Sequence, residues 1–322
     1  MSIERVAQVI EISLPIFALI FIGVWLRKKK VLTPEQLGGI NWILFNLSLP
    51  ALLLRSIAPQ DFSSLYQPAI IVGSLIPIVM SVVVFLGLSP LVRVRRPLKG
   101  PFVAGVFWAN ATYIGFPLAF NAFGETGLVN AAIVNAFVMP AFVTCGVLLY
   151  TFVGNEGESF SLRNLLKSIF NPIINSVVLG LLISWGVSTF GAPSGWSLRA
   201  VLQVDRVLEP LGQLGLPMAL IAVGASLDFH SIRGKWMPLF LSVFGKLVLT
   251  PLACFLLIRW VFPNCEREAL GVAVLIMATP CSVASFVVSR KMGVEPEFVS
   301  AQMVTSTMLS VISLPVWLYI LV

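Results

Sequence analysis

Apolar runs of about twenty residues recur along the whole of this 322-residue chain. Hydrophobic residues make up 58% of the sequence and charged residues only 11%, whereas soluble globular proteins carry about a quarter of charged residues. A helix crosses the hydrocarbon core of a bilayer with roughly 20 apolar residues. The sequence therefore predicts an all-α integral membrane protein and excludes most cytosolic enzymes.

The apolar windows predict ten membrane-spanning helices, which leaves no room for a soluble domain. An even number of crossings places both ends of the chain on the same side of the membrane. The predicted spans are residues 6–26, 38–58, 68–89, 101–123, 127–153, 171–190, 205–227, 237–262, 267–289 and 297–321.

The 21 basic residues are distributed unevenly between the two sets of loops. Loops after the odd-numbered helices hold fourteen of them, the opposite side holds six, and Lys246 falls within a span. Because cytoplasmic loops are enriched in Lys and Arg, both termini are predicted to lie outside the cytoplasm of a multi-pass protein of the cell membrane. The net charge of +7 lies in short clusters rather than on one polar face, so no nucleic-acid partner is expected.

The four cysteines and the single histidine offer neither a disulfide framework nor a metal site. The cysteines show no CxxC spacing and lie mostly inside apolar runs, so we interpret them as small core residues. His230 lies in a predicted loop, where a solvated side chain is expected. We therefore expect no cofactor.

The two halves of the chain resemble each other. A shift of 167 residues aligns an 18-residue stretch beginning at Leu47 with one beginning at Leu214, and eight of the eighteen positions are identical. Chance in so biased a composition gives about one or two identities. The match predicts two five-helix repeats, residues 1–153 and 171–322, joined by a short cytoplasmic linker at 154–170. Because five is an odd number of crossings, the second repeat is inverted, an architecture typical of transporters.

Two spans carry helix-breaking motifs at corresponding places in the repeats. NATYIGFP interrupts the fourth span and ATPCS the ninth, and their prolines and glycine predict unwinding near mid-membrane. Half-helix N-termini at such breaks offer positive dipole ends to an anion. The alternative is that Pro117 and Pro280 merely kink ordinary helices, but the correspondence of the breaks favours a binding site. The candidate residues are Asn110, Thr112, Tyr113, Gly115, Pro117, Thr279, Pro280 and Ser282.

Pro50 and Pro217 form a second corresponding pair. A kink with small-residue packing explains them well, and the alternative that Asn46, Ser48 or Gln213 faces a cavity stays equally open. The hydroxyls of the tenth span are expected to bond to their own helix backbone.

Three further polar residues lie inside predicted spans. Asn135 in the fifth span is costly to bury and is therefore a candidate for the site. Glu11 lies near the end of its helix, where interfacial snorkelling explains it as well as function does. Lys246 lies well inside its span, where a charge is costly, so we expect it to contact a carboxylate or backbone carbonyls and to supply positive charge near the broken helices; a purely structural lysine is the alternative.

Together these features resemble the auxin efflux carrier family of membrane transporters over nearly the whole chain. The resemblance implies a ten-helix fold similar to the bile-acid sodium symporters, in which a mobile crossover domain carries the crossing, broken helices 4 and 9 beside a panel domain. It also implies a substrate carboxylate held near the crossover, at positions that Asn110, Pro117, Asn135 and Pro280 match. The short linker implies a bacterial or short-loop carrier. The residues that carry the resemblance are Asn110, Gly115 and Pro117, the run Leu49–Leu53, Lys246 with Leu247 and Pro251, and the pattern from Ala278 through Pro280 to Pro315.

The leading hypothesis is a secondary transporter that moves small organic anions, such as carboxylates or auxin-like acids, by an elevator mechanism. A channel, or a receptor for an organic anion, is the alternative. An enzyme is not expected, because the spans hold no paired carboxylates and no nucleophile with its base. The expected partners are the anion and the lipid bilayer, while the sequence leaves the substrate, the transport direction, the coupling ion and a homodimer open.

Overall fold

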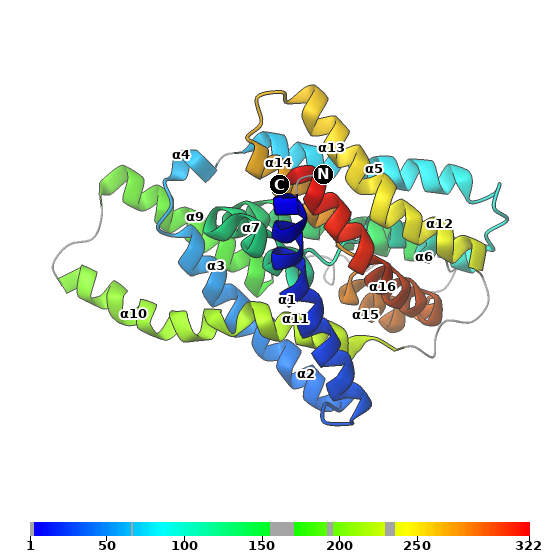
Figure 1. The fold of residues 1–322 in the computed structure, drawn as a ribbon, viewed down its shortest axis with the longest axis horizontal. Coiled ribbons are helices and arrows are strands. Elements are labelled where there is room, and N and C mark those ends of the chain that lie inside the picture. The colour runs from blue at the N-terminus through cyan, green and yellow to red at the C-terminus, as the bar shows by residue number, and fades with distance from the viewer. Residues whose placement is uncertain (1–2, 66, 155–170, 192–195, 229–235) are drawn as a thin grey trace.

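The computed structural model describes residues 3–65, 67–154, 171–191, 196–228 and 236–322, and regular structure in these ranges is helical apart from one isolated β-bridge (Figure 1). The α-helices are α1 (Ile3–Lys28), α2 (Pro34–Ile43), α3 (Leu49–Ile57), α4 (Phe62–Leu65), α5 (Pro68–Leu88), α6 (Arg96–Phe107), α7 (Phe116–Leu149), α9 (Pro172–Phe190), α10 (Trp196–Gln213), α11 (Gly215–Ser226), α12 (Trp236–Phe244), α13 (Thr250–Val261), α14 (Arg267–Ala278), α15 (Val283–Lys291) and α16 (Pro296–Leu321). Four π-helical segments adjoin them: η1 (Leu44–Ser48), η2 (Ala111–Gly115), η3 (Tyr150–Gly154) and η5 (Gly245–Leu249).

Eight helical stretches in the described ranges are long and apolar enough to cross a membrane. The prediction of a multi-pass membrane protein is therefore confirmed. Outside these stretches lie the 4-residue α4 and the helices α6, α14 and α15. The last three have only 12, 12 and 9 residues, because the spans predicted at 101–123 and 267–289 are both interrupted. The eight stretches are Glu4–Lys28, Pro34–Ile57, Pro68–Leu88, Ala111–Val153, Pro172–Phe190, Gln203–Ser226, Trp236–Val261 and Pro296–Leu321.

The stretch Ala111–Val153 bends sharply at Gly124. It has 43 residues, which is about 65 Å of helix, whereas the hydrocarbon core is about 30 Å thick. Gly124 has φ 62° and ψ −148°, a backbone conformation that residues with a Cβ rarely adopt. Two helical arms therefore follow one another around this glycine, where the sequence predicts two helices separated by residues 124–126.

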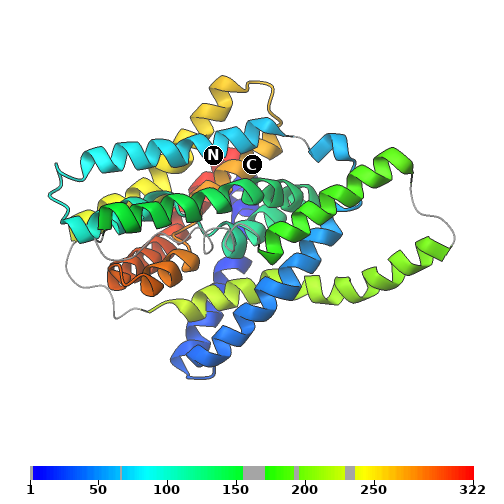
Figure 2. The same ribbon diagram turned by 180° about the vertical axis from the view of Figure 1, so that it is seen from behind.

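One set of helices, which we call the scaffold group, consists of α1, α2, α3, α9, α10 and α11. Helix α1 packs along α11, and the backbones meet so closely that a Cβ on Gly224 would lie 1.9 Å from the Ile20 carbonyl oxygen. Helix α3 packs against α9 and α10, and a Cβ on Gly180 would lie 3.0 Å from Ile57. Helices α9 and α10 extend to one side of the molecule, left in Figure 1 and right in the reverse view of Figure 2.

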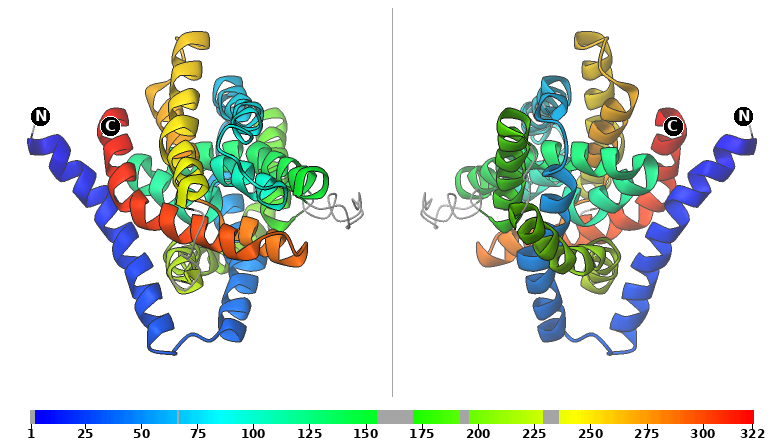
Figure 3. Two further views of the ribbon diagram at one scale, coloured as in Figure 1. Left: turned by 90° about the vertical axis from the view of Figure 1, so that its right-hand side faces the viewer. Right: turned by 90° about the vertical axis from the view of Figure 1, so that its left-hand side faces the viewer.

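The other set, which we call the crossover group, consists of α5, α6, α7 and α12–α16. Glycines again permit its tightest contacts: Gly146 receives the ring of Trp108, and Gly105 receives the side chain of Gln302. The groups meet where α1 contacts α7 and α16, where α3 contacts α7, and where α11 contacts η2. The start of α1 and the end of α16 lie at the same end of the molecule (Figure 3).

Candidate functional site

The two interrupted helices cross at their unwound segments. Helix α6 ends at Phe107 and α14 at Ala278, and the residues that follow pair as antiparallel backbone, with a bridge between Ala109 and Cys281. The amide of Asn110 donates to the Pro280 carbonyl at 2.9 Å, and the amide of Ser282 donates to the Trp108 carbonyl at 3.1 Å. Each break thus satisfies backbone groups of the other, as unwound backbone inside a membrane requires.

The first break lies slightly earlier in the chain than its sequence motif suggests. The backbone leaves the helix at Trp108 and returns to it at Ala111 as the π turn η2. Pro117 consequently lies in the first turn of α7 and not in the unwound segment. A proline is well tolerated there, because the first amides of a helix need no acceptor within it.

The start of α15 is capped by its own surroundings. The Ser282 hydroxyl accepts a hydrogen bond from the Ala284 amide at 3.1 Å, and the Cys281 amide donates to the Ser306 hydroxyl at 2.9 Å. The Thr279 hydroxyl donates to the Ile276 carbonyl at 2.7 Å. The polar groups of the second break, at Thr279, Pro280 and Ser282, are therefore occupied by intramolecular bonds.

The start of η2 differs, because no side chain caps it in the described structure. The amides of Ile114 and Gly115 both donate to the Asn110 carbonyl, which leaves those of the residues before them without an intrahelical acceptor. The Asn110 side chain is 4% exposed, and its amide nitrogen Nδ2 has no partner among the described residues. This helix start thus holds several donors without acceptors among the described residues, and we call it the η2 end.

The remaining candidates of the fourth and fifth spans lie around the η2 end or beyond it. Thr112 and Tyr113 are half-buried, and Tyr113 packs against a buried cluster of Leu44, Ala219 and Ala222. Gly115 faces α14, where a Cβ would meet Ile276 at 3.4 Å. Asn135 on α7 is 1% exposed, and neither atom of its amide has a partner in the described part of the chain.

In the described residues, the side chains of Asn46 and Ser48 make no hydrogen bond to the broken helices. The Asn46 amide donates to the Trp42 carbonyl of its own helix at 2.8 Å. Ser48 is buried, and its hydroxyl has no partner within the described ranges. In the tenth predicted span, the hydroxyls of Ser306, Thr307 and Ser310 donate to carbonyls three or four residues earlier, as expected. The expectation is wrong for Thr305, whose hydroxyl has no partner among the described residues.

Lys246 connects η5 to the second break. It is fully buried, and its ammonium Nζ donates to the Met277 carbonyl at 2.5 Å, one residue before α14 ends. Among the described residues no carboxylate forms an ion pair with Lys246.

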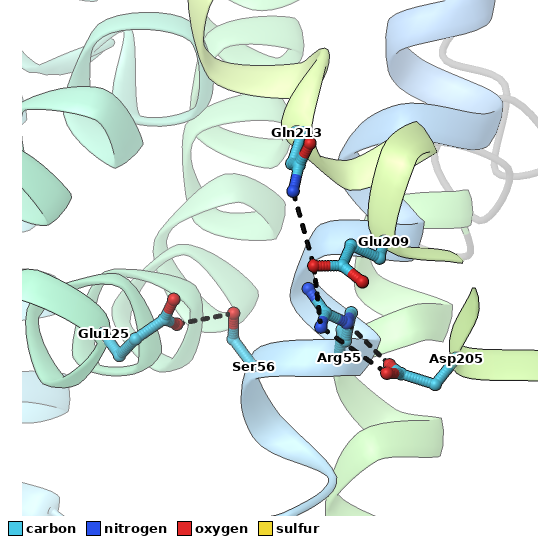
Figure 4. A network of polar contacts seen from close by, with 6 residues as sticks. All are labelled: Arg55, Ser56, Glu125, Asp205, Glu209 and Gln213. Atoms are coloured by element: carbon cyan, nitrogen blue, oxygen red, sulfur yellow. Dashed lines mark hydrogen bonds and ion pairs between the residues drawn. The ribbon is translucent and has the colours of Figure 1, made fainter. Parts of the chain in front are cut away.

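A cavity of about 1210 Å³ lies beside the crossover, between α1, α3, α7, α9, α10 and α11. Pro117 reaches it from the first turn of α7, and most other lining side chains are apolar. A polar network lines part of its wall (Figure 4). The Arg55 Nε donates to Asp205 at 2.6 Å, its Nη2 lies 3.5 Å from Glu209, and the Ser56 hydroxyl donates to Glu125 at 3.0 Å.

Sequence reasoning missed this network, although Gln213 stood as an alternative for a cavity and does line it. One signal was available: Asp205, Glu209 and Gln213 recur every four residues and so share one face of α10. Glu11 is exposed near the start of α1. His230 and nearly all of the predicted linker lie outside the described residues.

The fold and the crossing breaks place this molecule in the class of multi-pass helical membrane proteins with two broken helices that cross each other. A family model described as membrane transport protein matches residues 8–318. The chain therefore belongs to this family, the auxin efflux carriers, and the resemblance seen in the sequence is confirmed.

Several curated relatives match over nearly their full length. A protein of Rhizobium meliloti named "Putative malonate transporter" is 26% identical over 321 residues, covering 98% of this chain and 96% of that protein. An uncharacterized transporter of Methanothermobacter thermautotrophicus is 25% identical over 319 residues, covering 97% and 98%. The uncharacterized transporter YfdV of Escherichia coli is 23% identical over 317 residues, covering 95% and 96%. These names, like the family, are those of transporters.

Proposed function

We propose that this protein is a secondary transporter that moves small organic anions across the cell membrane and binds the substrate carboxylate at the η2 end. The observation that carries the proposal is the contrast between the two breaks: α15 is capped, whereas Asn110 Nδ2 and the first amides of η2 lack acceptors among the described residues. A buried donor without an acceptor is costly, and a carboxylate oxygen would satisfy several donors at once. The malonate in the name of the R. meliloti relative supports an organic anion as substrate.

The proposed topology has ten crossings in two inverted repeats, with both termini outside the cytoplasm. Besides the paired breaks, the helices α3 and α11 support it. Helix α3 begins at Leu49, one residue before Pro50, and α11 begins at Gly215, two residues before the corresponding Pro217. New helical segments thus begin at nearly equivalent points of the second and seventh predicted spans, as expected of a repeat.

The proposed transport step is an elevator-like displacement of the crossover group against the scaffold group. The closest glycine contacts support this displacement. At these glycines an added Cβ would lie about 3 Å or less from a neighbouring atom, and in the described residues every such contact lies within one of the two groups. Because no glycine contact of this kind in the described part of the chain joins the two groups, none of them opposes a displacement of one group against the other. The scaffold glycines are Gly23, Gly180, Gly212 and Gly224, and those of the crossover group are Gly73, Gly100, Gly105, Gly127, Gly146, Gly245 and Gly271.

Lys246 is proposed to take the role of a coupling cation at the crossover. Its ammonium bonds to the Met277 carbonyl at the end of α14, a group of the kind that an alkali cation would coordinate. Transport would then require no sodium. This proposal supplies the positive charge from the chain itself.

The test is uptake of labelled malonate, succinate and indole acetate by the purified protein in proteoliposomes. Asn110→Ala is expected to weaken binding of the transported acid by about 1–3 kcal/mol, which is about 5–150-fold. Asn175→Ala, which alters an exposed asparagine of α9, is the matched control. Unchanged affinity in Asn110→Ala would remove this residue from the site.

The same vesicles separate a carrier from a channel. A carrier shows saturable uptake that unlabelled substrate on the opposite side accelerates, because the loaded site returns faster than the empty one. Linear, unaccelerated flux would favour the channel alternative.

A further inference from the structure

Arg55 is the one basic side chain on the wall of the 1210 Å³ cavity, and its guanidinium is only partly used. The Nε and Nη2 groups face Asp205 and Glu209 on α10. In the described part of the chain, Nη1 makes no hydrogen bond. A guanidinium carries five N–H donors and binds carboxylates through pairs of them. Arg55 therefore retains donors that a further carboxylate can use.

The carboxylates that now contact Arg55 are easily displaced. The Arg55 side chain is 37% exposed, and those of Asp205 and Glu209 are 40% and 46% exposed. Ion pairs in contact with water contribute little to stability, because the high dielectric constant of water weakens the attraction and holding both side chains in place costs conformational entropy. A soluble carboxylate can thus replace Asp205 on the guanidinium at small cost.

The rest of the cavity wall selects the kind of acid. Apolar side chains surround the polar network, including Ile16, Leu19, Leu52, Leu208, Leu216 and Leu220. Asp205, Glu209 and Glu125 add three carboxylates to the same cavity. A second carboxylate on the ligand would meet these like charges, whereas an apolar body would pack against leucine and isoleucine. The lining fits an acid with one carboxylate and an apolar body.

We propose that Arg55 is a second anion site of this protein, at which the carboxylate of an amphipathic monocarboxylic acid replaces that of Asp205. The cavity continues from Arg55 to Pro117, in the first turn of the helix that starts at the η2 end. The Arg55 site thus captures the acid before it passes to the η2 end. This second step rests on the proposed function, whereas binding at Arg55 does not.

Chemical protection tests the binding directly on the purified full-length protein. Phenylglyoxal modifies arginine, and peptide mass spectrometry follows the rate at Arg55, with the exposed Arg259 of α13 as internal control. At about ten times its dissociation constant, hexanoate is expected to slow labelling of Arg55 about tenfold and to leave Arg259 unchanged. Methyl hexanoate, which lacks the charge, is expected to have no effect, and malonate to need higher concentrations. Absence of protection by hexanoate, equal protection by its methyl ester, or stronger protection by malonate overturns the proposal.

Two variants separate an anion site from a structural tie between α3 and α10. Arg55→Gln is expected to raise the KM for an amphipathic acid about fivefold, and Asp205→Asn, which frees the guanidinium, to lower it by a similar factor. The maximal rate is expected to stay unchanged in both, because the η2 end is intact. A structural tie predicts equal losses of thermal stability and no opposed shifts in KM, and that result overturns the proposal.

The experiments distinguish a failure of the proposed transport function from a failure of the proposed Arg55 site. If the wild type transports no organic acid, the proposed function fails, and protection of Arg55 alone then decides this inference. If transport occurs and Asn110→Ala impairs it while Arg55 is unprotected, the proposed function stands and this inference fails.

Discussion

Replacing Lys246 by methionine is expected to abolish transport without destabilising the fold. The ammonium is fully buried, and the structure gives it one acceptor, the Met277 carbonyl at 2.5 Å. Methionine has a similar length and shape but carries neither charge nor donor. The variant therefore removes the proposed cation and preserves most of the packing.

Two opposing terms set the size of the stability change. A lysine at the centre of a membrane helix costs about 3 kcal/mol on insertion scales, and methionine removes this cost. The Met277 carbonyl then loses its partner, which costs about 1–3 kcal/mol. The net change lies between about 0 and 2 kcal/mol in favour of the variant, the difference of these terms.

Uptake and thermal unfolding measured on the same preparations check both halves of the prediction. Wild-type uptake is expected to be equal in sodium, potassium and choline media, and Lys246→Met and Lys246→Gln to lose it. Lys291→Met, which alters an exposed lysine of α15, controls for general effects of charge removal. Strict sodium dependence of the wild type, or full activity of both Lys246 variants, would refute the coupling role. Clear destabilisation with retained transport would show a structural lysine.

Three further predictions concern packing, capping and orientation. Gly224→Leu is expected to lower the melting temperature through an overpacking cost of about 1–3 kcal/mol, because a Cβ there would lie 1.9 Å from the Ile20 carbonyl oxygen. Gly186→Leu is the control, since no atom lies within 4 Å of an added Cβ at that position. Equal melting temperatures of the two variants would contradict the close approach of α11 to α1. Ser282→Ala is expected to cost about 1 kcal/mol of unfolding free energy by removing the cap of α15, and an unchanged unfolding curve would show that the cap contributes nothing. A reporter active only in the cytoplasm is expected to work when fused after residue 156 and to fail after Val322, and the reverse pattern would invert the topology.

The spans and the two breaks could be predicted because each depends on local sequence. A run of apolar residues predicts a membrane helix from its length alone. The glycine and proline of NATYIGFP and the proline of ATPCS predict the two interruptions. The restart of the helix at Ala111 was less predictable, since Pro117 is compatible with both an unwound segment and a first helical turn. The sharp bend at Gly124 is likewise not predictable, because a glycine between the spans predicted at 101–123 and 127–153 is compatible with both a loop and a bend within continuous helix.

The polar network at Arg55 could not be predicted, because it depends on tertiary structure. Arg55 and Asp205 are 150 residues apart, and the packing of α3 against α10 brings them together. The capping role of Ser282 was also hidden. A serine beside a helix break is equally compatible with binding a ligand and with capping the helix. In the structure the Ser282 hydroxyl caps α15, because it accepts a hydrogen bond from the Ala284 amide.

The corner at Gly124 makes the two arms of α7 mechanically continuous. Helix resumes directly on both sides of this single residue, so no flexible loop takes up movement between the arms. We therefore expect a displacement of η2 to move the second arm of α7, which carries Asn135, as well. A few flexible residues inserted at Gly124 are expected to uncouple the two arms.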